Sequence, residues 1–407
     1  MRILFIHQVG GRGGAGVMLL NIIAALDRQE TEPMVVCPAG DMVEALKRQS
    51  VTVRVAPRPI RQFTHISGYS YPAFHPAFVR GAVGLLRDRQ FWCDYIRSSG
   101  ADIVHLNALT LSPMASSVRA AGAKAVCLVQ ETAVRGLLGL RTAWLRRLLS
   151  AQMDAVAFIS EYDRQRARCT APIVEVTPNW VNLADYDLAP SRHDARRALG
   201  LPADGKVVLM MGGVSRLKGT LTLMRAAEHL GDVDGLVVLV AGDTRSSPGD
   251  PLTRLRRAHI GLRRLARIDY PDQVERALSR GDVRQRVRFI GMQSDVLPLY
   301  AAADVVVFPA TAPHQARPVI EAGAMRKPVV VSDFPNVREF VQDGVNGLAV
   351  PPGDAGKLAD AIRALLEDRS LADRLGEANY DTTREHHNAD INGPRFVSIY
   401  RRVMGSA

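Results

Sequence analysis

Short runs of apolar, often β-branched residues recur along the first half of the chain, separated by segments with helical spacing of apolar positions. The runs that predict strands here are Ile3–Ile6, Met34–Cys37, Val51–Val55, Ile103–Leu106, Ala125–Val129, Ala155–Ile159 and Ile173–Val176. Runs that are apolar throughout are typical of strands covered by helices on both faces. Their alternation with helices predicts an α/β domain with a doubly wound parallel sheet.

The second half repeats this alternation. Its predicted strands are Val207–Met211, Leu236–Ala241, Asp304–Pro309, Pro328–Ser332 and Leu348–Val350. Helices are expected at 194–199, 319–325, 353–366, 371–380 and 391–403, with a short helical turn at 336–342. The loose, charged segment 185–204 separates the halves, so we expect a domain boundary near 180–200, with domains at 1–180 and 181–389.

Composition is that of an ordinary globular protein, since 47% of the 407 residues are hydrophobic and 23% are charged. No run approaches the ~18 uncharged apolar residues of a membrane-spanning helix. The first strand follows Met1-Arg2 directly, and the four cysteines are scattered without metal-site or redox spacing. We therefore expect a cytoplasmic protein with reduced structural thiols.

The net charge of +11 suggests an anionic partner. Nucleic acid is the weakest of the candidates, because no nucleic-acid-binding motif accompanies the charge, and we expect no such partner. Much of the excess lies in 253–288, where eleven arginines face four acidic residues. The segment Arg254–Arg267 could form a basic amphipathic helix that lies on anionic lipid at the inner face of the cytoplasmic membrane, or a solvated helix with one stripe packed on the domain.

A polar, proline-rich loop, Ala310–Pro318, follows the strand at 304–309. Ligands of parallel sheets bind at the carboxyl ends of the strands, and free N–H groups at the start of the next helix favour an anion such as a diphosphate. Glu321, one turn into that helix, is placed to bind a ribose diol. It could equally be an acidic residue that the helix dipole favours.

A glycine-rich segment follows the first strand and contains Gly11-x-Gly13-x-x-Gly16, formally a dinucleotide-binding fingerprint. Three residues separate it from the strand, and the second strand ends in Cys37-Pro38 instead of a ribose-binding acid, so we disfavour that function. We expect a flexible loop in which Gly13 and Gly14 let a ligand approach the backbone.

Polar residues also end two further strands of the first half. His105 and Asn107 end one of them, and His105 is either a cleft residue or a satisfied core histidine. Gln130 and Glu131 end another, and we expect them in a cleft because this pair is costly to bury. The aromatic segment His65–Pro76 is either a loop over the acceptor side or an ordinary surface excursion.

The second half resembles the retaining glycosyltransferases of family 4, which have the GT-B architecture. The resemblance rests on Ile320-Glu321-Ala322, Lys327-Pro328-Val329-Val330, the run from Glu339 to Gly347, and the Lys218-Gly219 pair after Gly212-Gly213. Weaker matches in the first half include Asp102–Asn107 and Pro178–Asn182. The resemblance implies two Rossmann-like domains facing a cleft, with the C-terminal helix, about 390–407, packed back on the first domain.

The resemblance also implies roles for particular residues. Lys218 would bind the donor diphosphate at the Gly212-Gly213 loop, Glu321 the nucleotide ribose, and Glu339 would support the second loop. Two positions depart from the family pattern. Pro313 stands where the family has its first glutamate, so we expect His314 and Gln315 near the sugar. Gly213 stands where the family has an arginine, so we expect Arg216 to supply that charge.

The implied function is transfer of a sugar, with retention, from a nucleotide-sugar donor to a hydroxyl acceptor in glycan, envelope polysaccharide or glycolipid synthesis. We expect no cofactor and no metal. Two alternatives stay open: a GT-B nucleotide-sugar epimerase, and a weakly active sugar-nucleotide-binding scaffold protein.

Overall fold

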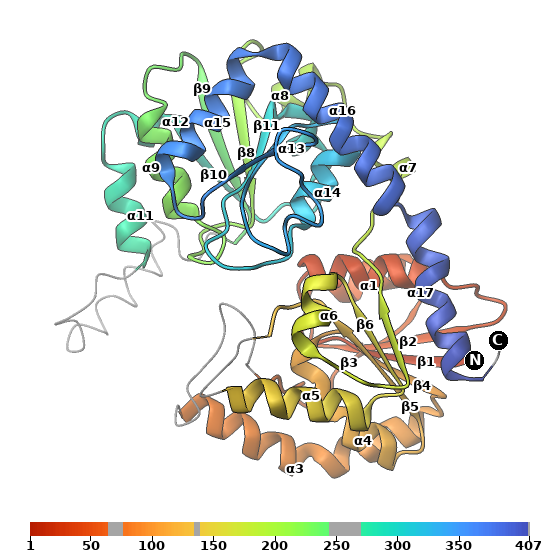
Figure 1. Cartoon of the computed structure of the whole chain (residues 1–407). Coiled ribbons are helices and arrows are strands. Elements are labelled where there is room, and N and C mark those ends of the chain that lie inside the picture. Colours follow the sequence, from red (N-terminus) through yellow and green to blue (C-terminus); the bar gives the residue numbers. More distant parts are fainter. Residues whose placement is uncertain (64–75, 134–138, 244–269, 406–407) are drawn as a thin grey trace. The chain divides into compact units, whose positions relative to one another are not determined.

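The protein forms two compact α/β units in a computed structural model, which describes residues 1–63, 76–133, 139–243 and 270–405 (Figure 1). The first unit comprises residues 1–182 and 386–407, and the second comprises 183–385. Two stretches singled out in the sequence, most of His65–Pro76 and all of Arg254–Arg267, lie outside the described residues.

The first unit is built on a parallel sheet with the strand order β3-β2-β1-β4-β5-β6-β7. Its strands are β1 (Arg2–Ile6), β2 (Glu32–Cys37), β3 (Thr52–Val55), β4 (Ile103–Leu106), β5 (Lys124–Val129), β6 (Ala155–Phe158) and β7 (Ile173–Val176). Along β1, Ile3 and Phe5 enter one hydrophobic cluster while Leu4 and Ile6 enter another. This alternation puts apolar side chains on both faces, which explains the continuous apolar runs in the sequence.

Helices cover both faces of this sheet. They are α1 (Gly14–Ala24), α2 (Asp41–Arg48), α3 (Pro76–Ser99), the 3₁₀ helix η1 (Leu109–Met114), α4 (Ala115–Ala120), α5 (Leu140–Gln152), α6 (Glu161–Ala167) and α17 (Ala389–Val403). The C-terminal helix α17 buries Phe396 and Tyr400 in the cluster that contains Phe5 and Trp180. The last helix of the chain is therefore an integral part of the first unit's core.

The second unit has a parallel sheet with the order β10-β9-β8-β11-β12-β13. Its strands are β8 (Lys206–Met211), β9 (Leu236–Ala241), β10 (Val287–Gly291), β11 (Val305–Phe308), β12 (Val329–Ser332) and β13 (Leu348–Val350). Its helices are α7 (Leu183–Tyr186), α8 (Arg192–Ala198), α9 (Thr220–His229), α11 (Tyr270–Leu278), α12 (Val283–Arg286), α13 (Leu297–Ala302), α14 (Arg317–Ala324), α15 (Ala355–Glu367) and α16 (Arg369–His386).

All twelve strands predicted from apolar runs are present, with ends that differ by a residue or two. The edge strand β10 was not predicted as a strand, because Arg288 and Gly291 interrupt its apolar run. The short helical turn expected at 336–342 is confirmed: this segment forms hydrogen-bonded turns, with helical bonds from Arg338 N–H to Phe334 O and from Val341 N–H to Val337 O.

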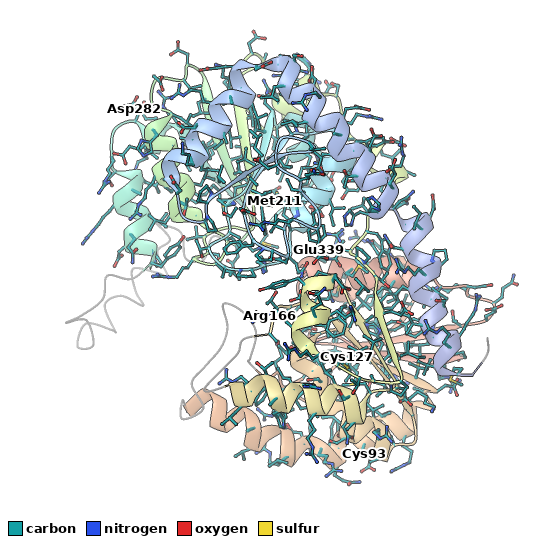
Figure 2. All side chains as sticks on the ribbon, in the orientation of Figure 1. Cys93, Cys127, Arg166, Met211, Asp282 and Glu339 are labelled. Carbon is teal, nitrogen blue, oxygen red and sulfur yellow. The ribbon has the colours of Figure 1, made fainter. Side chains whose placement is uncertain are left out.

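No helix of the described residues is long and apolar enough to cross a membrane. The four cysteines are free thiols, and Cys93 on α3 and Cys127 on β5 are labelled in Figure 2. Cys37, Cys93 and Cys127 are buried, in keeping with structural thiols that behave as small hydrophobic residues.

Candidate functional site

Each sheet reverses its strand order once: between β1 and β4 in the first unit, and between β8 and β11 in the second. Parallel sheets bind ligands outside the carboxyl ends of the strands at such a switch point, because the loops there leave in opposite directions. The sequence-predicted donor residues follow β8 and β11, so the fold of the second unit brings them to one place.

The loop after β8 holds Lys218 against its own backbone. A Cβ atom added to Gly212 would lie 2.2 Å from Lys218 Cδ and 2.5 Å from its Nζ, so the lysine side chain lies directly against this glycine. Burial lowers the pKa of Lys218, and the nearby Glu321 carboxylate opposes that shift. Lys218 is thus a cation at the switch point that lies close to an acidic partner.

The departure at Gly213 has a steric reason. Its backbone is left-handed, with φ of 69°, and a Cβ atom there would lie 2.2 Å from the carbonyl oxygen of Asp243. An arginine at this position would therefore collide with the loop after β9 in addition to adopting a backbone conformation that side chains disfavour. Gly213 contributes close packing here, not a phosphate-binding side chain.

The loop after β11 is tied to the loop after β8. Thr311 donates its N–H to Leu217 O at 2.9 Å and its hydroxyl to Arg216 O at 2.8 Å. Buried Asn336 donates to His314 O at 2.8 Å, which fixes the other end of the loop. The two segments that carry the candidate donor residues are therefore held together by hydrogen bonds from Thr311 to two backbone carbonyl oxygens.

The His314 ring stacks on Phe308 with the centroids 6.0 Å apart and an angle of 14° between the planes. Burial, together with the positive charge of Lys218, lowers the pKa of His314 to about 3. The imidazole is therefore neutral at physiological pH and has one donor and one acceptor nitrogen. This is the chemistry needed to contact sugar hydroxyls.

Glu321 lies in the first turns of α14 and is 8% exposed. Its Oε2 accepts a hydrogen bond of 2.6 Å from the Tyr300 hydroxyl, and its Oε1 accepts one of 2.8 Å from Arg317 Nε. An ionised carboxylate has about four acceptor sites, so Glu321 retains capacity for a ligand. Tyr186 belongs to the same cluster, since burial and the nearby Glu321 charge raise its pKa.

The remaining donor-side residues, Arg216, Gln315 and Glu339, lie on the segments that follow β8, β11 and β12. Arg216 is exposed, and its guanidinium lies 5.1 Å from the centre of the Tyr270 ring, a cation–π distance. Gln315 is half-buried in the loop after β11, and Glu339 is exposed on the turns after β12. Among the described residues, no hydrogen bond or ion pair joins Arg216 to Lys218, His314 or Glu321.

In the first unit, His105 is fully buried on β4. Its Nδ1 pairs with the Tyr400 hydroxyl at 2.8 Å and its Nε2 with Asn107 Oδ1 at 3.3 Å. The expectation of a cleft residue is therefore wrong for His105, which is a satisfied core histidine surrounded by Phe5 and Phe396.

Asn107 is also fully buried, so it has no exposed surface for an acceptor. Its amide pairs with His7 Nδ1 at 2.9 Å and with Ala15 O at 3.0 Å. Gln130, 8% exposed, donates to the Asn107 carbonyl oxygen at 3.0 Å. Gly13 and Gly14 are exposed at the N-terminus of α1.

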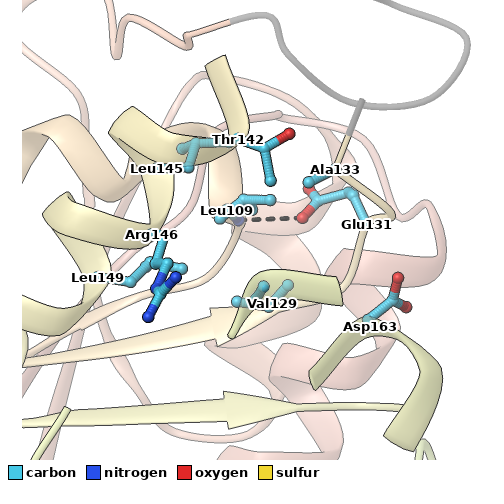
Figure 3. Close-up of a pocket in the computed structure, with 10 residues that line it drawn as sticks. Leu109, Val129, Glu131, Ala133, Thr142, Leu145, Arg146, Leu149 and Asp163 are labelled. Atoms are coloured by element: carbon cyan, nitrogen blue, oxygen red, sulfur yellow. Dashed lines mark hydrogen bonds between the residues drawn. The ribbon is translucent and has the colours of Figure 1, made fainter. Parts of the chain in front are cut away.

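Glu131 follows β5 and lines a small pocket with Leu145, Leu149 and Asp163 (Figure 3). Its Oε2 accepts from Leu109 N–H at 3.0 Å, the dashed line of Figure 3, and from Gln130 N–H at 3.3 Å. Burial raises the pKa of Glu131 to about 7, although these backbone donors oppose the shift.

Models of two known protein families match this chain, one in each unit. A family model described as "Glycosyl transferases group 1" matches residues 191–382, and one described as "Glycosyl transferase 4-like domain" matches 13–180. The chain belongs to the group 1 glycosyl transferases.

The relatives of this group 1 glycosyltransferase include a lipopolysaccharide core biosynthesis glycosyltransferase, LpsE, of Rhizobium meliloti. It is 32% identical over 187 residues, which are 46% of this chain and 47% of LpsE. A D-inositol 3-phosphate glycosyltransferase of Nocardia farcinica is 27% identical over 372 residues, 89% of this chain and 70% of the relative. The matches span about half the length of the first curated relatives.

Among solved structures, Anabaena HepE in complex with UDP and glucose superposes with a TM-score of 0.75, 21% identity and 98% coverage of both chains. The similarity shows that the fold of this group 1 glycosyltransferase is of the GT-B class, with two Rossmann-like α/β domains.

Sequence reasoning missed four residues of this group 1 glycosyltransferase that the structure brings to its switch points: His7, Tyr300, Arg317 and Asn336. Only Arg317 carried a usable signal, because it precedes Glu321 by four residues on one helix. Within the described part of the chain, no group of three or more histidine, cysteine, aspartate or glutamate side chains is arranged to hold a metal ion.

Proposed function

We propose that the protein is a retaining glycosyltransferase that moves a sugar from a nucleotide-sugar donor to a hydroxyl acceptor. The observation that carries this proposal is the cluster of Lys218, His314 and Glu321 at the switch point of the second sheet. A cation, a neutral imidazole and a carboxylate match the three parts of such a donor: diphosphate, sugar and ribose.

Lys218 supplies the charge that the leaving group requires. Negative charge develops on the diphosphate as the glycosidic bond breaks, and a fixed cation stabilises that charge more than it stabilises the intact donor. Because Lys218 is partly shielded from water, its interaction with phosphate is stronger than that of a surface lysine. Arg216, exposed nearby on the same loop, is the second cation in this proposal.

Glu321 binds the ribose diol with the lone pairs that Tyr300 and Arg317 leave available. These two partners hold the carboxylate in one orientation before the ligand arrives, which reduces the ordering cost of binding. His314 contacts the donor sugar in place of the glutamate that Pro313 replaces.

Retention follows from the family resemblance, in which the acceptor attacks from the face that the diphosphate leaves and the leaving phosphate assists deprotonation. We assign no protein nucleophile. The neutral state of His314 agrees with a positioning and hydrogen-bonding role in this scheme.

The acceptor is proposed to bind at the switch point of the first sheet, near the glycine-rich loop. LpsE, whose name refers to lipopolysaccharide core biosynthesis, supports an envelope glycan or glycolipid as the acceptor class. The arginine-rich segment 254–267 agrees with a lipid-linked acceptor at the inner face of the cytoplasmic membrane.

The test is a mass-spectrometric screen of nucleotide sugars with and without a panel of hydroxyl acceptors, beginning with UDP-glucose. The proposal predicts a product heavier than the acceptor by one sugar residue, and NMR of that product should show the anomeric configuration of the donor. An isomerised donor formed without acceptor would replace the proposal with an epimerase. Nucleotide-sugar binding without any turnover would favour the scaffold function.

A further inference from the structure

The switch point of the first sheet brings together two buried polar side chains from the ends of β1 and β4. His7 follows β1, Asn107 follows β4, and His7 Nδ1 lies 2.9 Å from Asn107 Nδ2. Both side chains are fully buried. His7 has no role in the function proposed above, although it occupies the position where parallel sheets bind ligands.

The orientation of the Asn107 amide follows from its neighbours. One end of the amide lies 3.0 Å from the carbonyl oxygen of Ala15, which can only accept, so that end is the nitrogen. Gln130 Nε2 donates to the other end at 3.3 Å, which agrees with an oxygen there. Asn107 therefore donates from one side and accepts from the other.

This orientation fixes the tautomer of His105. Its Nε2 faces Asn107 Oδ1, which can only accept, so Nε2 carries the proton. Burial lowers the pKa of His105 to about 3, so the ring is neutral and its Nδ1 has no proton. Nδ1 therefore accepts from the Tyr400 hydroxyl at 2.8 Å.

The same argument fixes the tautomer of His7. Its Nδ1 accepts from the Asn107 amide nitrogen, and burial lowers the pKa of His7 to about 4, so the neutral ring carries its proton on Nε2. That Nε2 is buried and has no hydrogen-bond partner among the described residues. An unpaired buried donor is costly, and such groups in native structures call for an explanation.

The unpaired Nε2–H of His7 lies close to the glycine-rich loop that follows β1. The position that a Cβ atom on Gly16 would occupy is 3.5 Å from His7 Nε2 and 3.2 Å from Gly11 O. This loop is exposed at Gly11, Gly13 and Gly14. Its glycines allow many backbone conformations, so the loop can rearrange at low cost.

We propose that His7 is an acceptor-contacting residue, which donates its Nε2–H to an oxygen of the acceptor substrate when the glycine-rich loop moves, and that Asn107 is the positioning residue that holds His7 in this tautomer. The proposal rests on the glycosyltransferase function above and assigns one side chain to its acceptor. Tyr400, on the C-terminal helix, is the last member of this hydrogen-bond series. It donates to His105 Nδ1 and so keeps the His105 proton on Nε2, which faces Asn107.

The first test is NMR of protein labelled with ¹⁵N in its histidines. The tautomers of a neutral imidazole give distinct nitrogen shifts, and His7 and His105 are assigned from single substitutions. We expect both rings to be neutral with the proton on Nε2 between pH 6 and pH 8. Asn107→Asp removes the amide donor, so His7 should then shift to the Nδ1–H tautomer or become charged.

The second test is kinetic. Glutamine can place an N–H near the position of His7 Nε2, whereas asparagine places one near Nδ1. His7→Gln should keep most of the activity, and His7→Asn should raise the acceptor KM or lower turnover about tenfold, the effect of one lost hydrogen bond. The donor KM should stay the same. Tyr95→Phe, in the same unit but outside this network, is the control.

Several outcomes would overturn the inference. A wild-type His7 that is charged, or that carries its proton on Nδ1, contradicts the tautomer assignment. Equal activity of His7→Asn and His7→Gln, or an effect on the donor KM alone, contradicts the acceptor contact. If the wild-type protein transfers no sugar, the proposed function and the acceptor contact both fail, while the NMR arm still decides whether Asn107 sets the His7 tautomer.

Discussion

At the residue scale, Gly213 shows that a position that departs from the family pattern can have a structural role of its own. Its φ of 69° and the close approach of the Asp243 backbone leave no room for a side chain. Gly213→Arg should therefore lower the melting temperature, since a left-handed non-glycine residue alone costs about 1–2 kcal/mol. It should also reduce turnover, because the loop that carries Lys218 would shift.

Calorimetric melting and steady-state kinetics check this expectation. Gly344→Arg is a matched control, because Gly344 also has a positive φ, of 72°, but a Cβ atom there meets no atom within 4 Å. A Gly213→Arg protein that is as stable as the control and more active than the wild type would contradict the packing account.

Glu321 gives a second prediction at this scale. Glu321→Gln removes the charge that Arg317 pairs with and one of the acceptor oxygens. Because hydrogen bonds to charged groups contribute about 1.5–3 kcal/mol, affinity for a nucleoside diphosphate should fall roughly tenfold or more. Isothermal titration calorimetry on the folded variant measures this change, and Glu377→Gln, an exposed glutamate of the same unit, serves as control. Equal affinities would remove the ribose assignment.

The sequence could suggest these residues but not their partners. Glu321 stood out by its position after a strand and a proline-rich loop. Tyr300, which holds its carboxylate, lies 21 residues earlier on another helix, and the Tyr400–His105 pair spans 295 residues. Such pairs depend on how helices pack on the sheet, which local patterns do not encode.

At the scale of elements, the turn after β5 gives a prediction about pH. Burial raises the pKa of Glu131 from 4.5 to about 7 in the folded protein, whereas the unfolded chain keeps the ordinary value. Between these pH values the folded state holds a proton that the unfolded state has released. The contribution of this group to stability is therefore present at low pH and is lost as the pH rises to about 7.

Urea denaturation at pH 5 and pH 8 checks this expectation in the wild type and Glu131→Gln. The variant cannot ionise at this position, so its stability relative to the wild type should rise by about 2 kcal/mol between the two pH values. A difference between the proteins that is the same at both pH values would show that Glu131 ionises normally in the fold.

Elements were predicted where burial on both faces made the sequence continuously apolar, as in β4, β9 and β12. Prediction failed where tertiary contacts decide the conformation. In the described part of the chain the strand β10 pairs with β9 alone, at the sheet edge, and its exposed face tolerates Arg288. The helical turn at 336–342 was predicted, but its long-range bond from Asn336 to His314 O was not.

At the scale of the whole molecule, the net charge of +11 predicts weak, reversible binding to anionic membranes through Arg254–Arg267. Each basic residue near an anionic surface contributes about 1 kcal/mol, and salt screens this attraction. In liposome co-sedimentation at low salt, the protein should pellet with anionic vesicles and not with neutral ones.

Replacing Arg254, Arg257, Arg263 and Arg264 by glutamate should abolish that binding. The matched control replaces four arginines outside the segment, Arg276, Arg280, Arg284 and Arg288, which changes the net charge equally. If the wild type stays in the supernatant, or if both variants lose binding equally, the segment has no specific membrane role.

The central claim is that the switch point of the second sheet binds the donor diphosphate through Lys218, and Lys218→Ala tests it most directly. We predict a fold that melts like the wild type and a loss of turnover of roughly ten- to a hundredfold, from one missing charge-assisted bond. Lys357→Ala, an exposed lysine of the same unit, should be unaffected. A folded Lys218→Ala protein with the turnover and nucleoside diphosphate affinity of the wild type would contradict the account.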